Sequence, residues 1–260
     1  MTGHFEEYSL VDAGASGLSL PWPASRAHGG GGLLAPQIRL SLRRVGDMTF
    51  QPESGNPGRD AWLRLQGFDP AASLALRLIH GRAVLIAGRP GELAGQSGDG
   101  IITANRTAHA VVTVADCLPI FIFDHRSGAF GVLHSGWQGT GILETAVDTL
   151  HAHFGSQPQE LAVTLGPHIG TCCYTVDEGR AAEFASRFGG AAVDRSRGQP
   201  RLDLLAANLD LARRLGLVHI AFTRSCTCCH PQYGSYRRQG AAEFTRMAAV
   251  IGYPTILEAV

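Results

Sequence analysis

The stretch VVTVADCLPIFIFDHRSGAFGVLHSGWQGTG, from Val111 to Gly141, decides how this chain is organised. Its apolar runs are Val111–Ala115, Leu118–Phe123 and Ala129–Leu133. Short apolar runs bounded by Asp, Ser and Gly are typical of buried strands, and Asp124–Gly128 has the composition of a hairpin turn. Cys117 and His134 stand at the ends of these runs. The pattern therefore predicts that two metal-ligating side chains converge on neighbouring strands.

The composition is that of a folded globular protein. The chain has 260 residues, of which 45% are hydrophobic and 17% charged, so we expect a full core and one domain. The formal net charge is +0, which indicates neither a nucleic acid nor an anionic membrane surface as partner. No apolar run approaches the roughly 20 residues that span a bilayer.

The cysteines and the N-terminus predict a cytoplasmic protein. The opening segment MTGHFEEYSL has no basic stretch followed by an apolar one, so it is not a secretory signal. Five of the six cysteines are grouped, as Cys172–Cys173 and as Cys226, Cys228 and Cys229. Adjacent cysteines rarely form disulfides with each other, so free thiols or metal ligands in a reducing compartment are the better interpretation.

The first 37 residues differ from the rest of the chain. Pro21 and Pro23 interrupt any helix, and the glycine run Gly29–Gly32 lacks the Lys and Ser or Thr that would follow in a phosphate-binding loop. We expect residues 1–37 to be a flexible N-terminal extension and residues 38–260 to be the catalytic domain.

Strand and helix patterns alternate through the domain, which predicts a single layered α/β (α+β) domain. Besides the opening stretch, the predicted strands are 38–45, 84–87, 161–165 and 218–222. The predicted helices are 60–66, 141–154, 177–188, 202–215 and a last one at 241–249.

Cys117 and His134 allow three interpretations. A thiolate and an imidazole are good Zn²⁺ ligands, and a third ligand would leave one position open for water. Alternatively, Cys117 is a nucleophile with His134 as its base. The third interpretation is a buried Cys beside an unrelated His, because Cys is among the most buried residue types.

A third ligand has to come from another segment. The candidates are His80, His109, His125, His168 and His230. His125 lies in the hairpin turn, away from the strand ends. His80 follows an apolar run and precedes Gly81, much as His134 precedes Ser135-Gly136, so its context makes it the best choice.

Two further segments carry chemistry. The segment CTCCH at Cys226–His230 indicates either a structural zinc site or, more simply, thiols packed near the main site. The segment SYRRQG contains Arg237, whose planar guanidinium suits phosphate or carboxylate, as does that of Arg44 at the end of the first domain strand.

Together these motifs resemble one known family. The quoted motifs are IHG (79–81), DGIIT (99–103), TVADCLPI (113–120), GVLHSGWQGTG (131–141), LGPHIGTCCYTVD (165–177), CTCC (226–229) and GSYRR (234–238). In this order they are similar to the YfiH-like, laccase-domain (polyphenol oxidase-like) family of purine nucleoside phosphorylases, over residues 38–260.

The resemblance implies a fold, a cofactor and an activity. It implies a single domain of mixed β-sheets sandwiched between α-helices, and a catalytic Zn²⁺ on His80, Cys117 and His134. The implied reactions are phosphorolysis of adenosine, inosine and methylthioadenosine, and adenosine deamination. The laccase label implies copper, but a multicopper oxidase needs many more His ligands than this set.

Purine nucleosides and phosphate are thus the expected partners. Position assigns Arg44, Arg237 and the helix N-terminus after Gly139 to phosphate, Asp116 to a hydrogen bond with a metal ligand, and Trp137 to the wall of the pocket. The alternatives are a cysteine hydrolase with a Cys117/His134 dyad, and a non-catalytic module that binds zinc and nucleoside.

Overall fold

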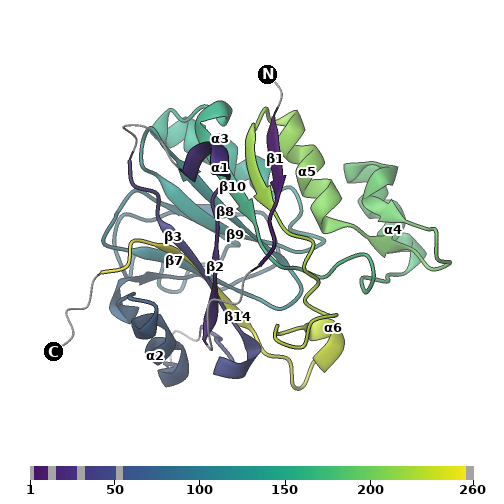
Figure 1. Cartoon of the computed structure of the whole chain (residues 1–260), viewed down its shortest axis with the longest axis horizontal. Coiled ribbons are helices and arrows are strands. Elements are labelled where there is room, and N and C mark those ends of the chain that lie inside the picture. The colour runs from purple at the N-terminus through teal and green to yellow at the C-terminus, as the bar shows by residue number, and fades with distance from the viewer. Residues whose placement is uncertain (1–2, 11–15, 28–32, 51–54, 256–260) are drawn as a thin grey trace.

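Two mixed β-sheets pack face to face in the computed structural model, which describes residues 3–10, 16–27, 33–50 and 55–255 (Figure 1). Among these residues the larger sheet has seven strands, ordered β1-β13-β10-β8-β9-β6-β5, and the smaller has five, ordered β2-β3-β14-β7-β4. The larger sheet comprises β1 (His4–Glu7), β5 (Val84–Ile86), β6 (Gly100–Thr103), β8 (Leu118–Asp124), β9 (Phe130–Ser135), β10 (Leu161–Leu165) and β13 (His219–Phe222). The smaller comprises β2 (Gly17–Leu20), β3 (Gln37–Ser41), β4 (Ser73–Leu74), β7 (His109–Val114) and β14 (Met247–Gly252). A short separate pair is formed by β11 (Val193–Asp194) and β12 (Arg201–Leu202).

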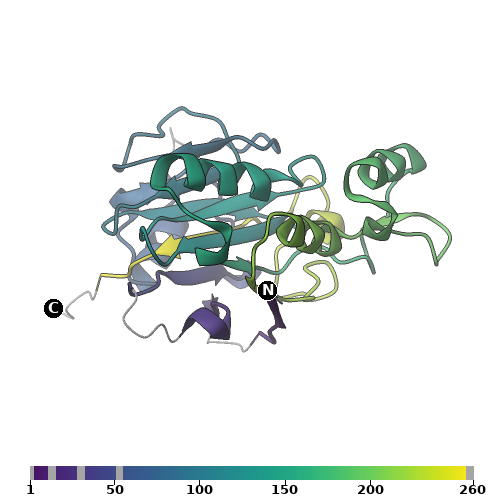
Figure 2. The same ribbon diagram turned by 90° about the horizontal axis from the view of Figure 1, so that it is seen from above.

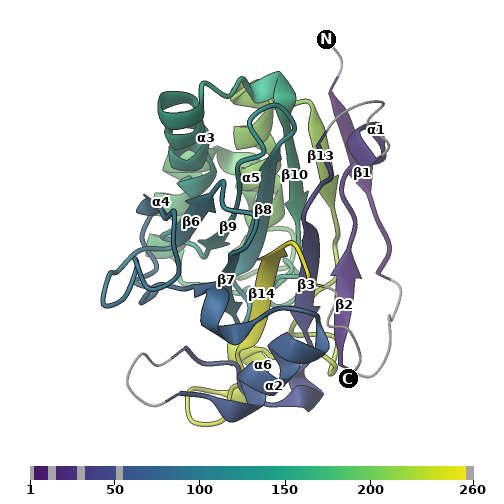
Figure 3. The ribbon, with the colours of Figure 1, turned by 90° about the vertical axis from the view of Figure 1, so that its left-hand side faces the viewer.

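Helices cover the outer faces of both sheets. The α-helices are α1 (Ala24–Ala27), α2 (Pro57–Leu65), α3 (Ile142–Phe154), α4 (Glu178–Phe188), α5 (Leu204–Arg214) and α6 (Tyr236–Gln239). The short 3-10 helices are Arg43–Val45, Pro70–Ala72, Pro158–Glu160 and Gly190–Ala192. Helices α3 and α5 lie over the larger sheet (Figure 2). Leu150 of α3 and Leu205 of α5 belong to the same buried cluster as side chains of that sheet. Helix α2 packs Trp62 and Leu63 on the smaller sheet, at Val250 (Figure 3). The predicted sandwich of mixed sheets between helices is therefore confirmed.

The opening stretch of the sequence analysis forms the centre of this arrangement. Strands β8 and β9 pair antiparallel as predicted, with Pro119 opposite His134. In their turn, Asp124 accepts hydrogen bonds from the backbone of Arg126 and Gly128, and Gly128 has a φ of 78°. Every residue of β8 and β9 is buried because helices cover one face and the smaller sheet covers the other. No helix in the described part of the chain is long and apolar enough to cross a membrane.

The predicted helix at 241–249 is wrong, because residues 241–246 form a turn and a loop and Met247–Ala249 begin β14. All six residues of β14 (MAAVIG) are buried, so the sequence shows no alternation, and its alanines favour a helix. Pairing with β3 on one side and β7 on the other satisfies its backbone and overrides that preference.

The N-terminal segment also differs from the flexible extension that we expected. His4–Glu7 pairs with β13, and Gly17–Leu20 pairs with β3. Leu18 and Leu20 are buried between the two sheets, and burial of these side chains stabilises the edge strand. The glycine run Gly29–Gly32 lies outside the described residues.

Candidate metal centre

His80, Cys117 and His134 come together at one point. One ligand atom from each lies within 4.8 Å of the others. Cys117 immediately precedes β8, His134 is in the neighbouring strand β9, and His80 comes from the connection between β4 and β5. The imidazole rings of His80 and His134 meet edge to face with centroids 4.8 Å apart. The structure thus brings together all three residues that the sequence analysis selected.

The backbone is strained at two points beside this cluster. His80 has a φ of 58° and Asp116 a φ of 85°, and among the described residues these are the non-glycine residues with positive φ. Such a conformation costs about 1 kcal/mol or more and persists where surrounding contacts enforce it. Asp99 accepts hydrogen bonds from the N–H of His80 at 2.8 Å and of Gly81 at 2.7 Å, which holds the first of these turns.

Asp99 also orients His134, a role that the sequence analysis did not assign to it. Its Oδ1 lies 3.0 Å from His134 Nδ1, and both side chains are buried. A carboxylate only accepts hydrogen bonds, so Nδ1 carries the proton and Nε2 is free to act as a ligand. Burial of Asp99 opposes its ionisation, but the hydrogen bonds from His134 and the Gly81 N–H lower the pKa of its carboxyl. The available signal was an Asp-Gly pair in the DGIIT motif, at the start of the buried strand β6.

The groups around His134 favour a positive charge on its ring. Burial disfavours a charged ring, but interactions with Cys117 and Asp99 outweigh burial and raise the pKa of His134 to about 10. The same charges that attract a proton would attract a metal cation in its place. By contrast, burial and the neighbouring His134 lower the pKa of His80.

Glycine is required next to the sulfur. A Cβ on Gly136 would lie 2.9 Å from Cys117 Sγ, closer than side-chain carbons approach other atoms. The SGW segment therefore lets the backbone pass directly beside the thiolate, and a larger residue would displace a candidate ligand.

The cluster opens into a cavity of about 1080 Å³. Its described lining combines the candidate ligands with cations and aromatic rings. The lining arginines are Arg59, Arg77, Arg180, Arg237 and Arg246, and the aromatic residues are Phe50, Trp137, Tyr174, Tyr236 and Phe244. Trp137, Asp116 and Arg237, which the sequence analysis selected, are among the lining residues. Arg44 is exposed in a 3-10 turn and is not part of this lining.

Asp116 and Arg237 make contacts that differ from those we expected. The carboxylate of Asp116 accepts hydrogen bonds from Thr227 Oγ1 at 2.6 Å and from the Arg237 N–H at 2.7 Å, so it secures the C-terminal loop. The hydrogen bond to a ligand histidine, which we assigned to Asp116, is made by Asp99. The Arg237 guanidinium donates to the carbonyls of Cys173 at 2.8 Å and Thr175 at 3.0 Å.

The N-terminus of α3, which we expected to meet phosphate, does not line this cavity. Gly139, Thr140, Gly141 and the residues of α3 are not in its described lining, and the Ile142 N–H donates to the Gly139 carbonyl at 3.0 Å. Arg82 lies against Gly141, the residue that precedes the helix. The described lining of the cavity therefore offers arginine side chains, and not this helix N-terminus, to an anion.

Arg180 and Tyr174 are lining residues that the sequence analysis missed. The Arg180 guanidinium lies over the Trp137 ring at 4.7 Å. Burial, together with the negative charge of Cys117, raises the pKa of Tyr174, while Arg180 and Arg237 oppose that shift. Tyr174, Cys117, Arg180 and Arg237 therefore surround one region of the cavity. Tyr174 belongs to the CCY motif, but Arg180 is one of several charges on α4 and has no sequence signal.

The remaining histidines have other partners. His109 lies 2.8 Å from the Ser73 hydroxyl, and His168 Nδ1 lies 3.0 Å from the Gly166 carbonyl. His125 packs edge to face on Phe123, and His230 packs on Tyr233. None of these four joins His80, Cys117 and His134 in the cluster.

The fold and the site define the class of protein: a layered α/β domain with a His₂Cys cluster in a cavity. The sequence model of a family described as "Multi-copper polyphenol oxidoreductase laccase" matches residues 44–254. The chain belongs to this family, and the resemblance drawn from its motifs is confirmed.

Named relatives agree with this assignment. A Deinococcus radiodurans protein named "Purine nucleoside phosphorylase" is 30% identical over 242 residues, which cover 92% of each chain. "Purine nucleoside phosphorylase LACC1" of Mus musculus is 31% identical over 183 residues, which cover 67% of this chain and 42% of that relative. The chain therefore spans less than half the length of the mouse protein. The crystal structure of the Bacillus licheniformis hypothetical protein YfiH has a TM-score of 0.80 at 21% identity, covering 94% of this chain and 98% of that one.

Proposed function

We propose that this chain is a zinc-dependent purine nucleoside phosphorylase. The observation that carries the proposal is the placement of His80, Cys117 and His134 in a cavity whose described lining also offers arginines and aromatic rings. Arginine suits the charge of phosphate, and aromatic rings suit the flat face of a purine. Named relatives, aligned over most of this chain, are called purine nucleoside phosphorylases.

The donor set fits a zinc ion with an open position. Two imidazoles and one thiolate are suitable Zn²⁺ ligands, and catalytic zinc sites keep three protein ligands and one free position. A His₂Cys set is also found in blue-copper sites, which add a weak axial Met. The described lining of this cavity includes no methionine, and Met48 and Met247 are buried in the core clusters. A Zn²⁺ held by these residues would supply Lewis acidity in the cavity.

The protein's own residues would bind and orient the substrates. Asp99 holds His134 in the tautomer that exposes Nε2 to the cavity. Arg180, backed by the Trp137 ring, is the cation that we assign to phosphate. Tyr174 keeps its proton because its pKa is raised, so its O–H can donate a hydrogen bond to a substrate oxygen.

The products would be a free purine base and ribose-1-phosphate, or the methylthio analogue from methylthioadenosine. Adenosine, inosine and methylthioadenosine are the substrates that we expect. Adenosine deamination is a further activity that we propose for the same site. In it, water would attack the purine carbon that bears the amino group and ammonia would leave, whereas in phosphorolysis phosphate attacks the anomeric carbon of the ribose and the purine base leaves.

One experiment tests the proposal directly. The purified protein is assayed with adenosine or inosine in the presence and absence of phosphate, and base, ribose-1-phosphate and ammonia are quantified. We expect phosphate-dependent release of base, loss of activity after chelation and recovery with Zn²⁺. Full activity in a metal-free protein, or in a Cys117→Ala variant, would refute the zinc-dependent mechanism.

A cysteine hydrolase is the second candidate. The observation that favours it is the chain of hydrogen bonds from Cys117 to His134 to Asp99, the order of a nucleophile, its base and an orienting carboxylate. The two candidates respond differently to chelation, which abolishes a zinc enzyme but leaves a thiol hydrolase active. A module that only binds zinc and nucleoside would take up both ligands without turnover.

A further inference from the structure

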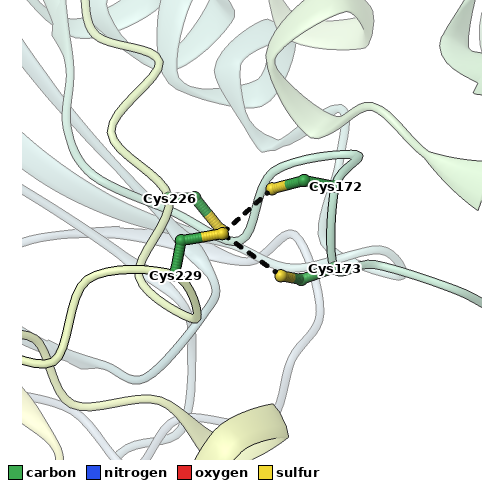
Figure 4. Close-up of side chains that lie close together, drawn as sticks. All are labelled: Cys172, Cys173, Cys226 and Cys229. Carbon is green, nitrogen blue, oxygen red and sulfur yellow. Dashed lines mark hydrogen bonds between the residues drawn. The ribbon is translucent and has the colours of Figure 1, made fainter.

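Cysteines from two distant parts of the chain meet at one point. Cys172 and Cys173 lie in the loop between β10 and α4, whereas Cys226 and Cys229 lie in the loop after β13. Their four sulfur atoms all lie within 4.8 Å of one another. Figure 4 shows the side chains of both loops pointing toward one another, with Cys229 Sγ 3.4 Å from the sulfurs of Cys172 and Cys173.

This cysteine cluster has the dimensions of a tetrahedral thiolate site. A Zn–S bond of about 2.3 Å implies sulfur–sulfur separations of about 3.8 Å in a regular tetrahedron. The two separations of 3.4 Å and the 4.8 Å limit for the whole cluster bracket that value. All six cysteines of the chain are free thiols, so none of these sulfurs is in a disulfide.

Backbone groups are arranged to stabilise a thiolate at Cys226. The Gly170 N–H donates a hydrogen bond to its sulfur at 3.2 Å, and the N–H groups of Cys228 and Cys229 also donate to it. Cys226 is buried, whereas Cys172 and Cys229 are exposed, so an ion could reach the cluster from solvent. Hydrogen bonds to ligand atoms of this kind are the usual second layer of a metal site.

From this geometry we propose that Cys172, Cys173, Cys226 and Cys229 bind a second metal ion, a structural Zn²⁺ separate from the one in the cavity. Four thiolates in a tetrahedral arrangement select zinc among the common divalent ions. The sequence analysis favoured packed thiols over a structural zinc site at the CTCCH segment. The structure instead places the sulfurs of the adjacent Cys172 and Cys173 each 3.4 Å from the sulfur of Cys229.

The ion would hold together two loops that form the cavity wall. Ile169 and Tyr174, which flank the first cysteine pair, line the cavity, and so do Tyr236 and Arg237 beyond the second pair. A backbone bridge between His168 and Cys226 already joins the loops at their start. We therefore expect the ion to raise stability and to keep Tyr174 in place, without contacting substrate.

Cobalt titration of the full chain tests this proposal. In a Cys117→Ser background, which removes the thiolate of the cavity site, Co²⁺ is added to the metal-free, reduced protein. We expect one Co²⁺ per chain with an intense sulfur-to-cobalt charge-transfer absorption, and displacement of this ion by Zn²⁺. Adding Cys229→Ser should weaken Co²⁺ binding by more than about tenfold. Cys228→Ser is the matched control, because Cys228 lies in the same loop but outside the cluster, and it should leave binding unchanged.

Thiol protection in the unmodified chain provides a second measurement that does not depend on any variant. With Zn²⁺ bound, alkylation followed by peptide mapping should find Cys172 and Cys229 protected although both are exposed, and chelation should make both reactive. The proposal is overturned if these thiols react equally with and without Zn²⁺. It is also overturned if the freshly isolated chain contains a disulfide between the two loops. Equal weakening of Co²⁺ binding by Cys228→Ser and Cys229→Ser would overturn it as well.

Discussion

Asp99 Oδ1 lies 3.0 Å from His134 Nδ1 and accepts a second hydrogen bond, at 2.8 Å, from the backbone N–H of His80. One buried carboxylate thus fixes the ring of one candidate ligand and the backbone of another. Since these two residues are 54 positions apart in the sequence, from 134 − 80, Asp99 determines whether they can meet at one ion.

Removing this charge should weaken metal binding. We expect Asp99→Asn to lower Zn²⁺ affinity about 10- to 100-fold, because the carboxylate that orients a ligand His contributes on that scale. Competition with a chromophoric chelator measures the change. Asp124→Asn is the matched control, since Asp124 is equally buried but bonds to Ser127 and Ser156 instead. Equal Zn²⁺ affinities in both variants would contradict the assigned role.

Zinc should stabilise the fold through the cavity site. A free Zn²⁺ concentration 100 times the dissociation constant is expected to add about 2.7 kcal/mol to the free energy of unfolding. Urea titrations with and without Zn²⁺ measure this difference in the Cys229→Ser background, which isolates the cavity site. His80→Ala should remove the effect. If Zn²⁺ still raises the free energy of unfolding of the His80→Ala variant, the ion binds at another site.

Arg180 should be required for phosphate. Arg180→Gln removes the guanidinium that lies over Trp137, and loss of one charge-assisted hydrogen bond is expected to raise KM for phosphate about tenfold or more. Steady-state kinetics with varied phosphate measure this, and Arg180→Lys should recover part of the loss. Arg214→Gln, on the exposed end of α5, should leave KM unchanged. An unchanged KM in Arg180→Gln would move phosphate binding to another arginine.

Acid should destabilise the fold through His109. Burial, only partly opposed by the charge of Asp69, lowers the pKa of His109 from 6.5 to about 4. Between these values the unfolded chain binds a proton and the folded chain does not, so stability falls as pH falls, by about 3 kcal/mol in total. Urea unfolding at several pH values measures this slope. His109→Gln should flatten it, whereas His153→Gln, on the exposed side of α3, should not.

Gly131 should tolerate no side chain. A Cβ at this position in β9 would lie 2.3 Å from the Ile101 carbonyl oxygen of the neighbouring strand. Overpacking of this kind costs about 1–3 kcal/mol, so Gly131→Ala should lower the free energy of unfolding by that amount. Gly190→Ala is the control, because nothing lies within 4 Å of its added carbon. Similar urea midpoints for the two variants would show that β9 can shift freely.

The hairpin and its two candidate ligands could be predicted because their determinants are local. Buried strands separated by a polar turn specify their own pairing, and Cys117 and His134 follow from their places at the strand ends. His80 was predicted from a similar local context. The predicted helix at 241–249 failed because its last three residues begin β14, which is buried on both faces and shows no period that separates a strand from a helix, while residues 241–246 form a turn and a loop.

The sequence by itself therefore determined the layered α/β fold, the family and the candidate ligands His80, Cys117 and His134. Only the tertiary structure decided that Asp99 orients His134, that Arg180 lies over Trp137 and that the adjacent cysteines meet the CTCC segment. The physical reason is the range of the interactions. Strand pairing and turn chemistry act between near neighbours, whereas these contacts join segments that become neighbours only when sheets and loops pack together.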